Sequence, residues 1–425
     1  MSTQTTTAVR IHGVEDLRLE TFDLPEIGED EILAEVTSDS ICMSTNKLAH
    51  QGEAHKRVRG SLAETPTMVG HEFCGTIKKV GSKWADQFTP GMKFAIQPAL
   101  NYKGTLWAPG YSYQYIGGDA TYVVIPSEVM ESNCLFGYKE DSFFTGSLTE
   151  PYSCVIGAFK AQYHMKPNDY THYMGIREGG TLAMLASVGP MGLAGLDVAL
   201  HQERKPRRIV VTDIAQDRLD RAAALLTVED AKKNGIELHY VNTGDMEDPV
   251  AELTKINEGE LFDDVFVFAP VRPVVELGSK LLAREGCMNF FAGPPRNDFE
   301  ATINFYDIHY SGHHYVATTG GTYEDVADAI DMFESGKLNP AVLVTHIGGL
   351  NVVEETTLNL PNIPGGKKLI YTHKRLDLVA IDDFAERGKT DPFYAELDRL
   401  CKANNGLWNK QAEEYLLEHA PSIDE

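Results

Sequence analysis

The chain contains 425 residues, of which 43% are apolar and 24% charged, a composition typical of a folded protein of two or three domains and not of a disordered one. Acidic residues (62) outnumber Lys and Arg (38), and the formal net charge of −24 disfavours binding to nucleic acids or anionic membranes. No apolar run approaches the ~20 residues that span a bilayer, the N-terminal stretch lacks a signal-peptide pattern, and the six cysteines form no CxxC pair. We therefore expect a cytoplasmic, enzyme-sized protein with reduced thiols.

Residues 1–155 are predicted to form a β-rich domain, because short alternating segments are interrupted by Gly, Pro or Asp about every ten residues. A barrel or sandwich of short strands accounts for this pattern. The predicted strands are 7–11, 31–36, 73–80 and 120–125.

Residues 156–337 are predicted to form a second, α/β domain with a doubly wound parallel sheet, because continuous apolar strands alternate there with helices. Six strands in this order are typical of dinucleotide-binding domains. Residues 338–373 are expected to return to the first domain, and 374–425 to form a charged helical extension. The predicted strands are 181–186, 208–212, 236–241, 265–268, 288–291, 315–318 and 368–371, and the predicted helices are 154–164, 192–200, 216–226, 274–282, 323–335, 392–402 and 411–419.

A glycine-containing turn lies between the first strand and helix of the predicted α/β domain. The run Ser187-Val188-Gly189-Pro190-Met191-Gly192 occupies the place where a GxGxxG motif binds a pyrophosphate, with Ser187 in place of the first Gly. Gly189 would let the backbone approach the pyrophosphate, and Gly192 would allow close packing of helix on strand. The helix N-terminus would supply N–H groups and a positive dipole end.

A carboxylate follows the next predicted strand. Asp213 stands where the adenosine ribose would lie, which favours NAD over NADP. The nearby cations Arg207, Arg208 and Arg218 leave NADP as an alternative. A cap at the start of the next helix remains the structural alternative for Asp213.

Three candidate zinc ligands occur in the β-rich domain: Cys42, His71 and Glu72. Thiolate, imidazole and carboxylate are zinc's preferred ligands, and three protein ligands leave one position for water or substrate. Glu150, at the domain junction, is a candidate fourth ligand or a partner of the metal-bound water; an N-cap for the helix after Pro151 explains it equally well. Singly, such a Cys would be an ordinary buried residue and such a His–Glu pair a surface feature.

These residues resemble, in chain order, motifs of the zinc-dependent medium-chain alcohol and polyol dehydrogenases. The resemblance extends over residues 7–373 and implies a GroES-like catalytic domain, a Rossmann coenzyme domain, catalytic zinc and NAD(H), with NADP(H) as the alternative. The chain is most similar to the members that interconvert L-sorbose 1-phosphate and D-glucitol 6-phosphate; unphosphorylated polyol dehydrogenases are the alternative. The motifs are Cys42, Gly70-His71-Glu72, 117–123, Glu150-Pro151 and 189–192 for the family, and 51–53, 70–75, 289–294 and 303–307 for that branch.

The resemblance also implies catalytic roles and marks departures. Ser44 matches the family's proton-relay hydroxyl, and a loop hydrogen bond is its alternative. Lys47 departs from the family, which often has a relay His at this position, and is a candidate next station; Glu72 is a further catalytic candidate. The four closely spaced Cys of a structural zinc lobe are absent from 97–118, so we expect one zinc per chain. Thr45 replaces a frequent Asp, so we expect either that another group fixes the tautomer of His71 or that the site binds metal less tightly.

A basic segment follows the first ligand. Residues 47–59 contain four Lys or Arg against one Glu, so Lys47, Lys56 and Arg57 are candidates for binding a substrate phosphate; a solvated loop is the alternative. A protein that kept the fold and lost catalysis is the hypothesis of a different class, against which the joint presence of the candidate ligands argues. We expect a homo-oligomer, a dimer or tetramer, whose partner is a small-molecule substrate.

Overall fold

The computed structural model describes residues 4–425, which divide into two compact units. Unit 1 contains the residues up to Glu150 together with 322–336 and 343–425, and unit 2 contains 151–321 and 337–342. The first three residues of the N-terminal stretch lie outside the described part. The division differs from the predicted one in four segments: 322–336 and the C-terminal extension group with unit 1, and 151–155 and 338–342 group with unit 2.

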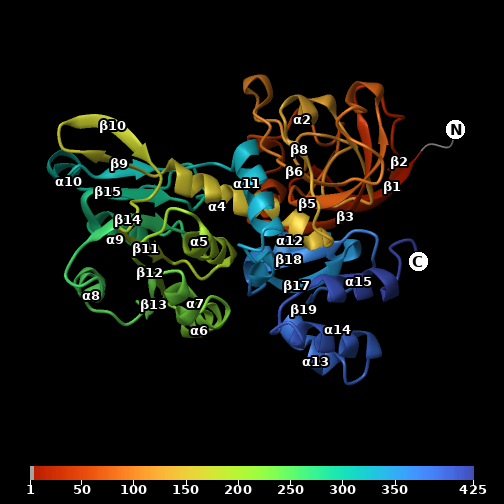
Figure 1. The fold of residues 1–425 in the computed structure, drawn as a ribbon. Helices are drawn as coiled ribbons and strands as arrows, with labels where there is room; N and C mark the ends of the chain where they lie inside the picture. Colours follow the sequence, from red (N-terminus) through yellow and green to blue (C-terminus); the bar gives the residue numbers. More distant parts are fainter. Residues whose placement is uncertain (1–3) are drawn as a thin grey trace. The chain divides into compact units, whose positions relative to one another are not determined.

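Unit 1 is built around β3 (Ile32–Ile41), which pairs with three other strands. The alternation of buried and partly exposed residues along its first half produces one core-facing side, as its sequence pattern predicts. An eight-stranded sheet has the order β19-β17-β18-β3-β5-β6-β8, with β7 also on β3, and a three-stranded sheet has the order β2-β1-β4 (Figure 1). The other strands are β1 (Thr5–Gly13), β2 (Asp16–Asp23), β4 (Thr67–Met68), β5 (Phe73–Val80), β6 (Lys93–Ile96), β7 (Tyr122–Ile125), β8 (Leu135–Gly137), β17 (Val344–Gly349), β18 (Lys367–Tyr371) and β19 (Val379–Ala380).

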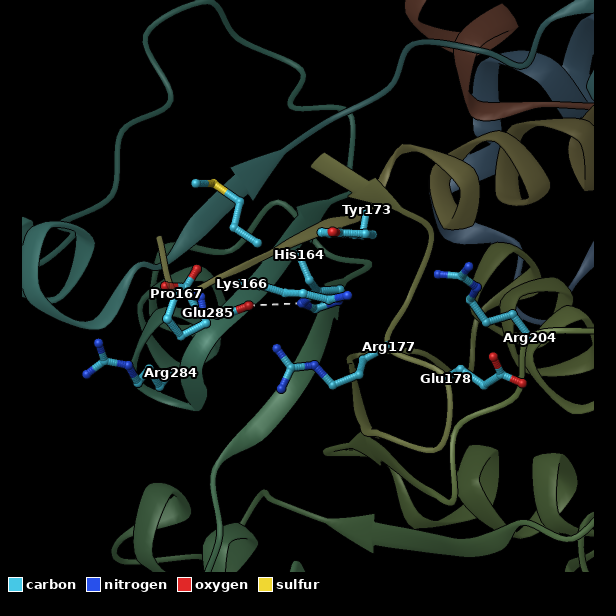
Figure 2. Close-up of a pocket in the computed structure, with 10 residues that line it drawn as sticks. His164, Lys166, Pro167, Tyr173, Arg177, Glu178, Arg204, Arg284 and Glu285 are labelled. Atoms are coloured by element: carbon cyan, nitrogen blue, oxygen red, sulfur yellow. Dashed lines mark hydrogen bonds between the residues drawn. The ribbon is translucent and has the colours of Figure 1, made fainter. Parts of the chain in front are cut away.

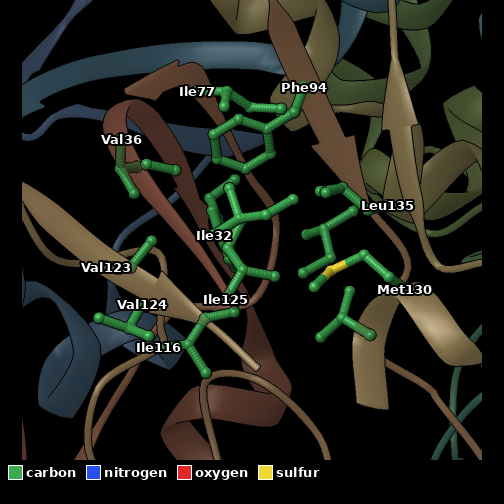
Figure 3. Close-up of a cluster of buried hydrophobic side chains, with 14 of the residues drawn as sticks. Ile32, Val36, Ile77, Phe94, Ile116, Val123, Val124, Ile125, Met130 and Leu135 are labelled. Atoms are coloured by element: carbon green, nitrogen blue, oxygen red, sulfur yellow. The ribbon is translucent and has the colours of Figure 1, made fainter. Parts of the chain in front are cut away.

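Apolar side chains from these strands fill a closed core. Figure 3 shows Ile32 of β3, Phe94 of β6 and Ile125 of β7 converging on one cluster, and all three are buried. Burial of this kind contributes about 25 cal/mol per Å² of apolar surface, and it fixes the ends of β3 and β5, from which the candidate ligands extend. The predicted β-rich domain is confirmed.

The C-terminal extension packs on unit 1 through a buried carboxylate. Glu413 accepts hydrogen bonds from the backbone nitrogens of Phe143 and Phe144 (2.7 and 2.8 Å) and from Tyr371 Oη (2.8 Å). Trp408, fully buried, donates to the same tyrosine oxygen (2.8 Å). The unit 1 helices are α1 (Met43–Gln51), α2 (Ser127–Glu131), α3 (Phe143–Ser147), α11 (Tyr323–Glu334), α12 (Val353–Asn359), α13 (Phe384–Arg387), α14 (Pro392–Lys402) and α15 (Lys410–His419).

Unit 2 contains a six-stranded parallel sheet of order β13-β12-β11-β14-β15-β16. This order reverses direction at β11, and a dinucleotide binds at such a switch point in doubly wound sheets. The predicted α/β class is therefore confirmed. The strands are β11 (Thr181–Leu185), β12 (Arg208–Asp213), β13 (Glu237–Asn242), β14 (Phe262–Val267), β15 (Leu282–Phe290) and β16 (His314–Val316).

The helices of unit 2 accompany this sheet, but one predicted helix is too long. The helix expected over 154–164 ends at Ala161, because residues 163–166 form β9 of an antiparallel hairpin with β10 (Asp169–Met174), which the sequence analysis missed (Figure 1). The helices are α4 (Thr149–Ala161, which begins in unit 1), α5 (Pro190–His201), α6 (Gln216–Leu225), α7 (Val228–Lys233), α8 (Pro249–Ile256), α9 (Arg272–Lys280) and α10 (Phe305–Ser311). Across residues 4–425, no helix is both long enough and apolar enough to cross a bilayer.

Candidate metal centre and cofactor site

The first candidate ligand stands at the junction of β3 and α1. Cys42 is the residue before α1, with an extended backbone (φ −115°, ψ 148°), so its thiol projects from the beginning of the helix. Ser44 Oγ donates a hydrogen bond to Cys42 Sγ (3.1 Å) and lies 3.2 Å from His71 Nε2. The predicted relay hydroxyl is therefore in contact with two of the predicted ligands.

His71 and Glu72 lie immediately before β5 (Phe73–Val80), on a turn that requires glycine. Gly70 adopts a left-handed conformation (φ 84°), and a Cβ there would lie 2.6 Å from the backbone nitrogen of Asp119. The expectation that Thr45 cannot orient the histidine is wrong, because Thr45 Oγ1 lies 3.3 Å from His71 Nδ1. A hydroxyl accepts a hydrogen bond from Nδ1–H as a carboxylate would, which leaves Nε2 free to coordinate a metal.

Burial determines the protonation states of His71 and Cys42. The pKa of His71 is lowered to about 4, chiefly by burial, so the imidazole is neutral and able to coordinate. Burial, and next the negative charge of Glu72, raises the pKa of the Cys42 thiol to about 12. A thiolate at this position therefore needs a further positive charge beside it, which a bound divalent cation would supply.

Glu72 forms a buried ion pair that the sequence analysis did not foresee. Lys367, on β18, places Nζ 2.5 Å from both carboxylate oxygens, and both side chains are almost completely buried. Burial is the largest single influence and opposes ionisation of Glu72, but the charge and hydrogen bonds of Lys367, together with neighbouring groups, outweigh it and lower the pKa of the carboxyl below its ordinary value. Glu72 is thus held as a carboxylate. Lys367 is 295 residues away in sequence, and nothing local to either residue predicts the pair.

Two further buried acids, Asp39 and Asp119, lie close to Glu72. Asp39 Oδ1 accepts a hydrogen bond from the backbone nitrogen of Glu72 (3.1 Å), and Asp119 lies beside Asp39. Burial raises the pKa of both carboxyls, that of Asp119 to about 7. Two buried acids side by side retain a proton more readily than Glu72, which alone has a cationic partner. Asp119 belongs to the 117–123 motif, but its pairing with Asp39 could not be predicted.

The three predicted ligands come together in the structure. One ligand atom each from Cys42, His71 and Glu72 lie within 4.8 Å of one another. Zinc bonds of about 2.0–2.3 Å in a tetrahedron separate ligand atoms by roughly 3.3–3.8 Å, so these residues fit one zinc ion after small adjustments. Glu150, buried in the first turn of α4, is not in this group of atoms, but its charge acts on the Cys42 thiol. Its part as fourth ligand stays a prediction.

The predicted phosphate-binding segment reaches the same site through an aromatic side chain. Tyr111 Oη lies 3.3 Å from His71 Nε2, and the guanidinium of Arg57 lies 5.5 Å from the centre of the tyrosine ring. His55 stacks on the ring of Tyr111 (5.5 Å between centroids). The pKa of His55 is lowered to about 4, first by burial and then by the charges of Arg57, Lys56 and Lys47. The positive charges of Lys47, Lys56 and Arg57 are therefore close together around His55, beside the candidate metal ligands. Tyr111 itself carried no sequence signal.

The predicted nucleotide-binding turn lies in unit 2 between β11 and α5. Gly189 is the residue before α5 and Pro190 its first residue, so the turn presents the free N–H groups of the helix start. Gly192 packs directly on the turn: a Cβ there would lie 2.0 Å from Ser187 O. Only glycine fits this contact, as the motif predicts. Met191 occupies the first turn of the same helix.

Asp213 and Arg218 lie where they can influence the choice between NAD and NADP. Asp213 ends β12, and its Oδ1 accepts hydrogen bonds from the backbone nitrogens of the next two residues (2.9 and 3.1 Å). Arg218 Nη2 lies 3.4 Å from the position of a Cβ on Gly189, beside the turn. The suggestion that Arg207 and Arg208 assist NADP is wrong. Arg208 is the first residue of β12 and Arg207 precedes it, at the opposite end of the strand from Asp213, and both pair with glutamates there.

The sequence and fold match known proteins throughout. A family model described as zinc-binding dehydrogenase matches residues 190–335, and one described as alcohol dehydrogenase GroES-like domain matches residues 28–132. The chain is 48% identical to mannitol-1-phosphate 5-dehydrogenase of Aliivibrio fischeri over 98% of both chains. It is 46% identical to L-sorbose 1-phosphate reductase of Klebsiella pneumoniae over 99% of both.

Solved structures agree on the fold. The structure is similar to that of 2R,3R-butanediol dehydrogenase from Bacillus subtilis, with a TM-score of 0.69 and 19% identity over 86% of this chain and 99% of that one. It is also similar to an alcohol dehydrogenase from Thermus sp. ATN1, with a TM-score of 0.66 and 18% identity over 86% of this chain and 99% of that one. At these identities the likeness concerns the fold alone. Full-length identity near one half, both family models and the converged Cys42, His71 and Glu72 together show that the chain belongs to the zinc-binding alcohol dehydrogenase family and is a zinc-dependent oxidoreductase with a nicotinamide cofactor.

Proposed function

We propose that the protein interconverts a ketose 1-phosphate and a hexitol phosphate, with L-sorbose 1-phosphate and D-glucitol 6-phosphate as the substrate pair. The observation that carries the proposal is the position of Arg57 against Tyr111, whose hydroxyl contacts His71. A guanidinium is well suited to a phosphate, because its N–H groups bind two oxygens at once. The names of two relatives that match the whole chain, both phosphorylated-sugar enzymes, support the same class.

One zinc ion per chain is proposed, held by Cys42, His71 and Glu72, with Glu150 near the remaining position. When bound, zinc polarises the substrate oxygen and the nicotinamide carries the hydride. The chain's own groups orient these partners: Thr45 fixes the histidine tautomer, and the Lys367 cation keeps Glu72 ionised.

Proton movement is assigned to Ser44 and Lys47. Ser44 Oγ contacts Cys42 Sγ and His71 Nε2, so its hydroxyl is placed to take a proton from a substrate hydroxyl bound there. Burial lowers the pKa of Lys47, three residues further along α1, which favours the neutral amine that can accept the proton passed on by Ser44. We propose Lys47 as the next station, and Glu72 as the charge that balances the site.

NAD(H) is the proposed cofactor, bound by the turn from Ser187 to Gly192 and by Asp213. Arg218 beside Gly189 keeps NADP(H) as the alternative, because an unpaired guanidinium would also accept a 2′-phosphate. Replacing Asp213 with Ala should narrow the ratio of kcat/KM for NAD⁺ over NADP⁺ at least tenfold. An unchanged ratio would remove Asp213 from the cofactor site. The dimer or tetramer expected from sequence stays a prediction.

Substrate phosphate recognition can be tested by comparing L-sorbose 1-phosphate with L-sorbose. The Arg57→Ala variant should lose about 10- to 100-fold in kcat/KM for the phosphate ester, because hydrogen bonds to charged groups contribute about 1.5–3 kcal/mol. The same variant should change little towards L-sorbose. The matched control is Arg59→Ala in the same segment, whose guanidinium lies over Trp107 (3.9 Å) and not over Tyr111. Equal kcat/KM of the wild-type protein for both substrates would favour an unphosphorylated polyol as substrate.

A further inference from the structure

A cavity of about 520 Å³ lies within unit 2, and none of its lining residues belongs to the site described above. The β9–β10 hairpin, the loop 175–180, Arg204 after α5 and the beginning of β15 form its walls (Figure 2). Small-molecule sites commonly have volumes of about 300–1,000 Å³. The cavity is therefore large enough for a metabolite.

The cavity wall is cationic although the chain is strongly acidic. Its charged lining residues are Lys166, Arg177, Arg204 and Arg284 against Glu178 and Glu285. The chain as a whole has a net charge of −24, so cations gather here against the overall composition. Such a local potential favours an anionic ligand.

Three of these cations form no direct ion pair within the described residues, although the Asp169 carboxylate across the hairpin acts on Lys166 at longer range. Within residues 4–425, no carboxylate lies at ion-pair distance from Lys166, Arg204 or Arg284, whereas Arg177 pairs with Asp263 (3.0 Å). Arg204 is nevertheless fixed, because its Nη1 donates to the carbonyl oxygens of residues 174 and 176 (2.9 and 3.3 Å). These hydrogen bonds fix the orientation of the Arg204 side chain, and its positive charge can interact with a ligand.

The floor of the cavity is held by a buried ion pair whose two charges balance each other. His164 is buried, with Nδ1 2.9 Å from the backbone oxygen of Glu285 and Nε2 3.1 Å from Asp264 Oδ1. Both neighbours are hydrogen-bond acceptors, so both ring nitrogens donate, as in an imidazolium ion. The other oxygen of Asp264 accepts from the backbone nitrogen of Arg177 (2.8 Å), which ties the floor to the wall.

The cations are spread along the cavity. Figure 2 shows Arg284 at one side and Arg204 at the other, with Arg177 and His164 between them. Tyr173 adds an aromatic face, over which Lys166 Nζ lies 4.1 Å from the ring centre. We propose that this cavity binds a small molecule with a phosphate at each end and an uncharged middle, of the sugar bisphosphate class. Each phosphate is a dianion with several acceptor oxygens, which suits separate arginine and lysine groups.

Calorimetric titration of the full-length protein with fructose 1,6-bisphosphate tests this, with NAD⁺ present at saturation to fill the nucleotide-binding turn. We expect at least tenfold weaker binding in the double variant Lys166→Ala/Arg284→Ala, in which both replaced side chains are exposed. The double variant Arg204→Ala/Arg284→Ala should show the same loss. The charge-matched control, Arg207→Ala/Arg296→Ala, removes two exposed arginines of unit 2 that pair with Glu260 and Asp298 and should bind within twofold of wild type.

A second control separates this cavity from the proposed substrate site. The Arg57→Ala variant should bind fructose 1,6-bisphosphate as the wild type does, and suberate, a dicarboxylate of similar reach, should bind at least tenfold more weakly. Absence of binding to the wild type, unchanged binding in both cavity variants, or loss of binding in Arg57→Ala would overturn the proposal. Equal binding of suberate would overturn the assignment to bisphosphates.

Discussion

Replacing Lys367 with Met removes the cation that neutralises Glu72 in the interior of unit 1. In the wild type the ammonium group lies 2.5 Å from both carboxylate oxygens, and the two side chains are 4% and 1% exposed. Removing one partner of such a buried pair costs about 3–5 kcal/mol, because the remaining charge is left without solvent or counter-charge. For a unit of this size, that corresponds to a melting temperature lower by at least about 6 °C.

The penalty should depend on pH in a defined direction. Lys367 lowers the pKa of Glu72, so in the wild type the pair stabilises the fold above the ordinary pKa of a Glu carboxyl, about 4.3, and this contribution disappears as pH falls through the lowered value. Without Lys367, burial raises the pKa of Glu72 and the folded protein takes up a proton. The difference between variant and wild type should therefore be large at pH 7 and shrink by more than half at pH 5.

Calorimetric melting of chelator-treated protein at pH 5 and pH 7 measures this difference. Lys368→Met is the matched control: the neighbouring lysine is equally buried but donates only to the carbonyls of residues 363, 364 and 366. Burial lowers the pKa of Lys368 only to about 8, so it stays protonated at both pH values and its loss should cost the same at each. A Lys367→Met penalty that is equally large at pH 5 and pH 7 would refute the buried-pair reasoning.

Two further predictions concern residues that hold the site and the C-terminal extension. Thr45→Val removes the hydroxyl beside His71 Nδ1 and should weaken zinc binding about 10- to 100-fold, measured by competition with a chelator. Thr45→Ser keeps the hydroxyl and should keep the affinity for zinc. Equal affinities in the two variants would contradict the orienting role of Thr45. Glu413→Ala leaves two buried N–H groups and Tyr371 Oη without their acceptor, at a cost of at least about 2 kcal/mol. Its melting temperature should fall by several degrees and residues 384–419 should become sensitive to protease, and an unchanged pattern would argue against the docking contact.

The sequence predicts those parts of the site that are encoded locally. The turn from Ser187 to Gly192 can be recognised because a strand, a glycine contact and a helix follow one another within a few residues, and Cys42 and His71 each stand at the end of a predictable strand. Their convergence follows from β3 and β5 being paired neighbours, so that the ends of both strands carry the ligands to one place.

The remaining features depend on contacts between distant segments. Lys367 meets Glu72 only because β18 pairs with β3, and Tyr111 reaches His71 from a loop without regular structure. The β9–β10 hairpin was missed because its first strand, which carries the buried His164, continues the apolar pattern of α4. Such contacts are set by tertiary packing, which composition and periodicity do not encode.

The zinc content of the purified protein tests the central claim most directly. Elemental analysis should find one zinc per chain in the wild type, retained after dialysis, and less than a tenth of that amount in Cys42→Ala and in His71→Ala. The control is Cys74→Ala, a buried thiol of the same unit that contacts Tyr138 and lies outside the group of candidate ligands. Zinc that remains at one per chain in both ligand variants would contradict the account, because the metal would then be bound elsewhere.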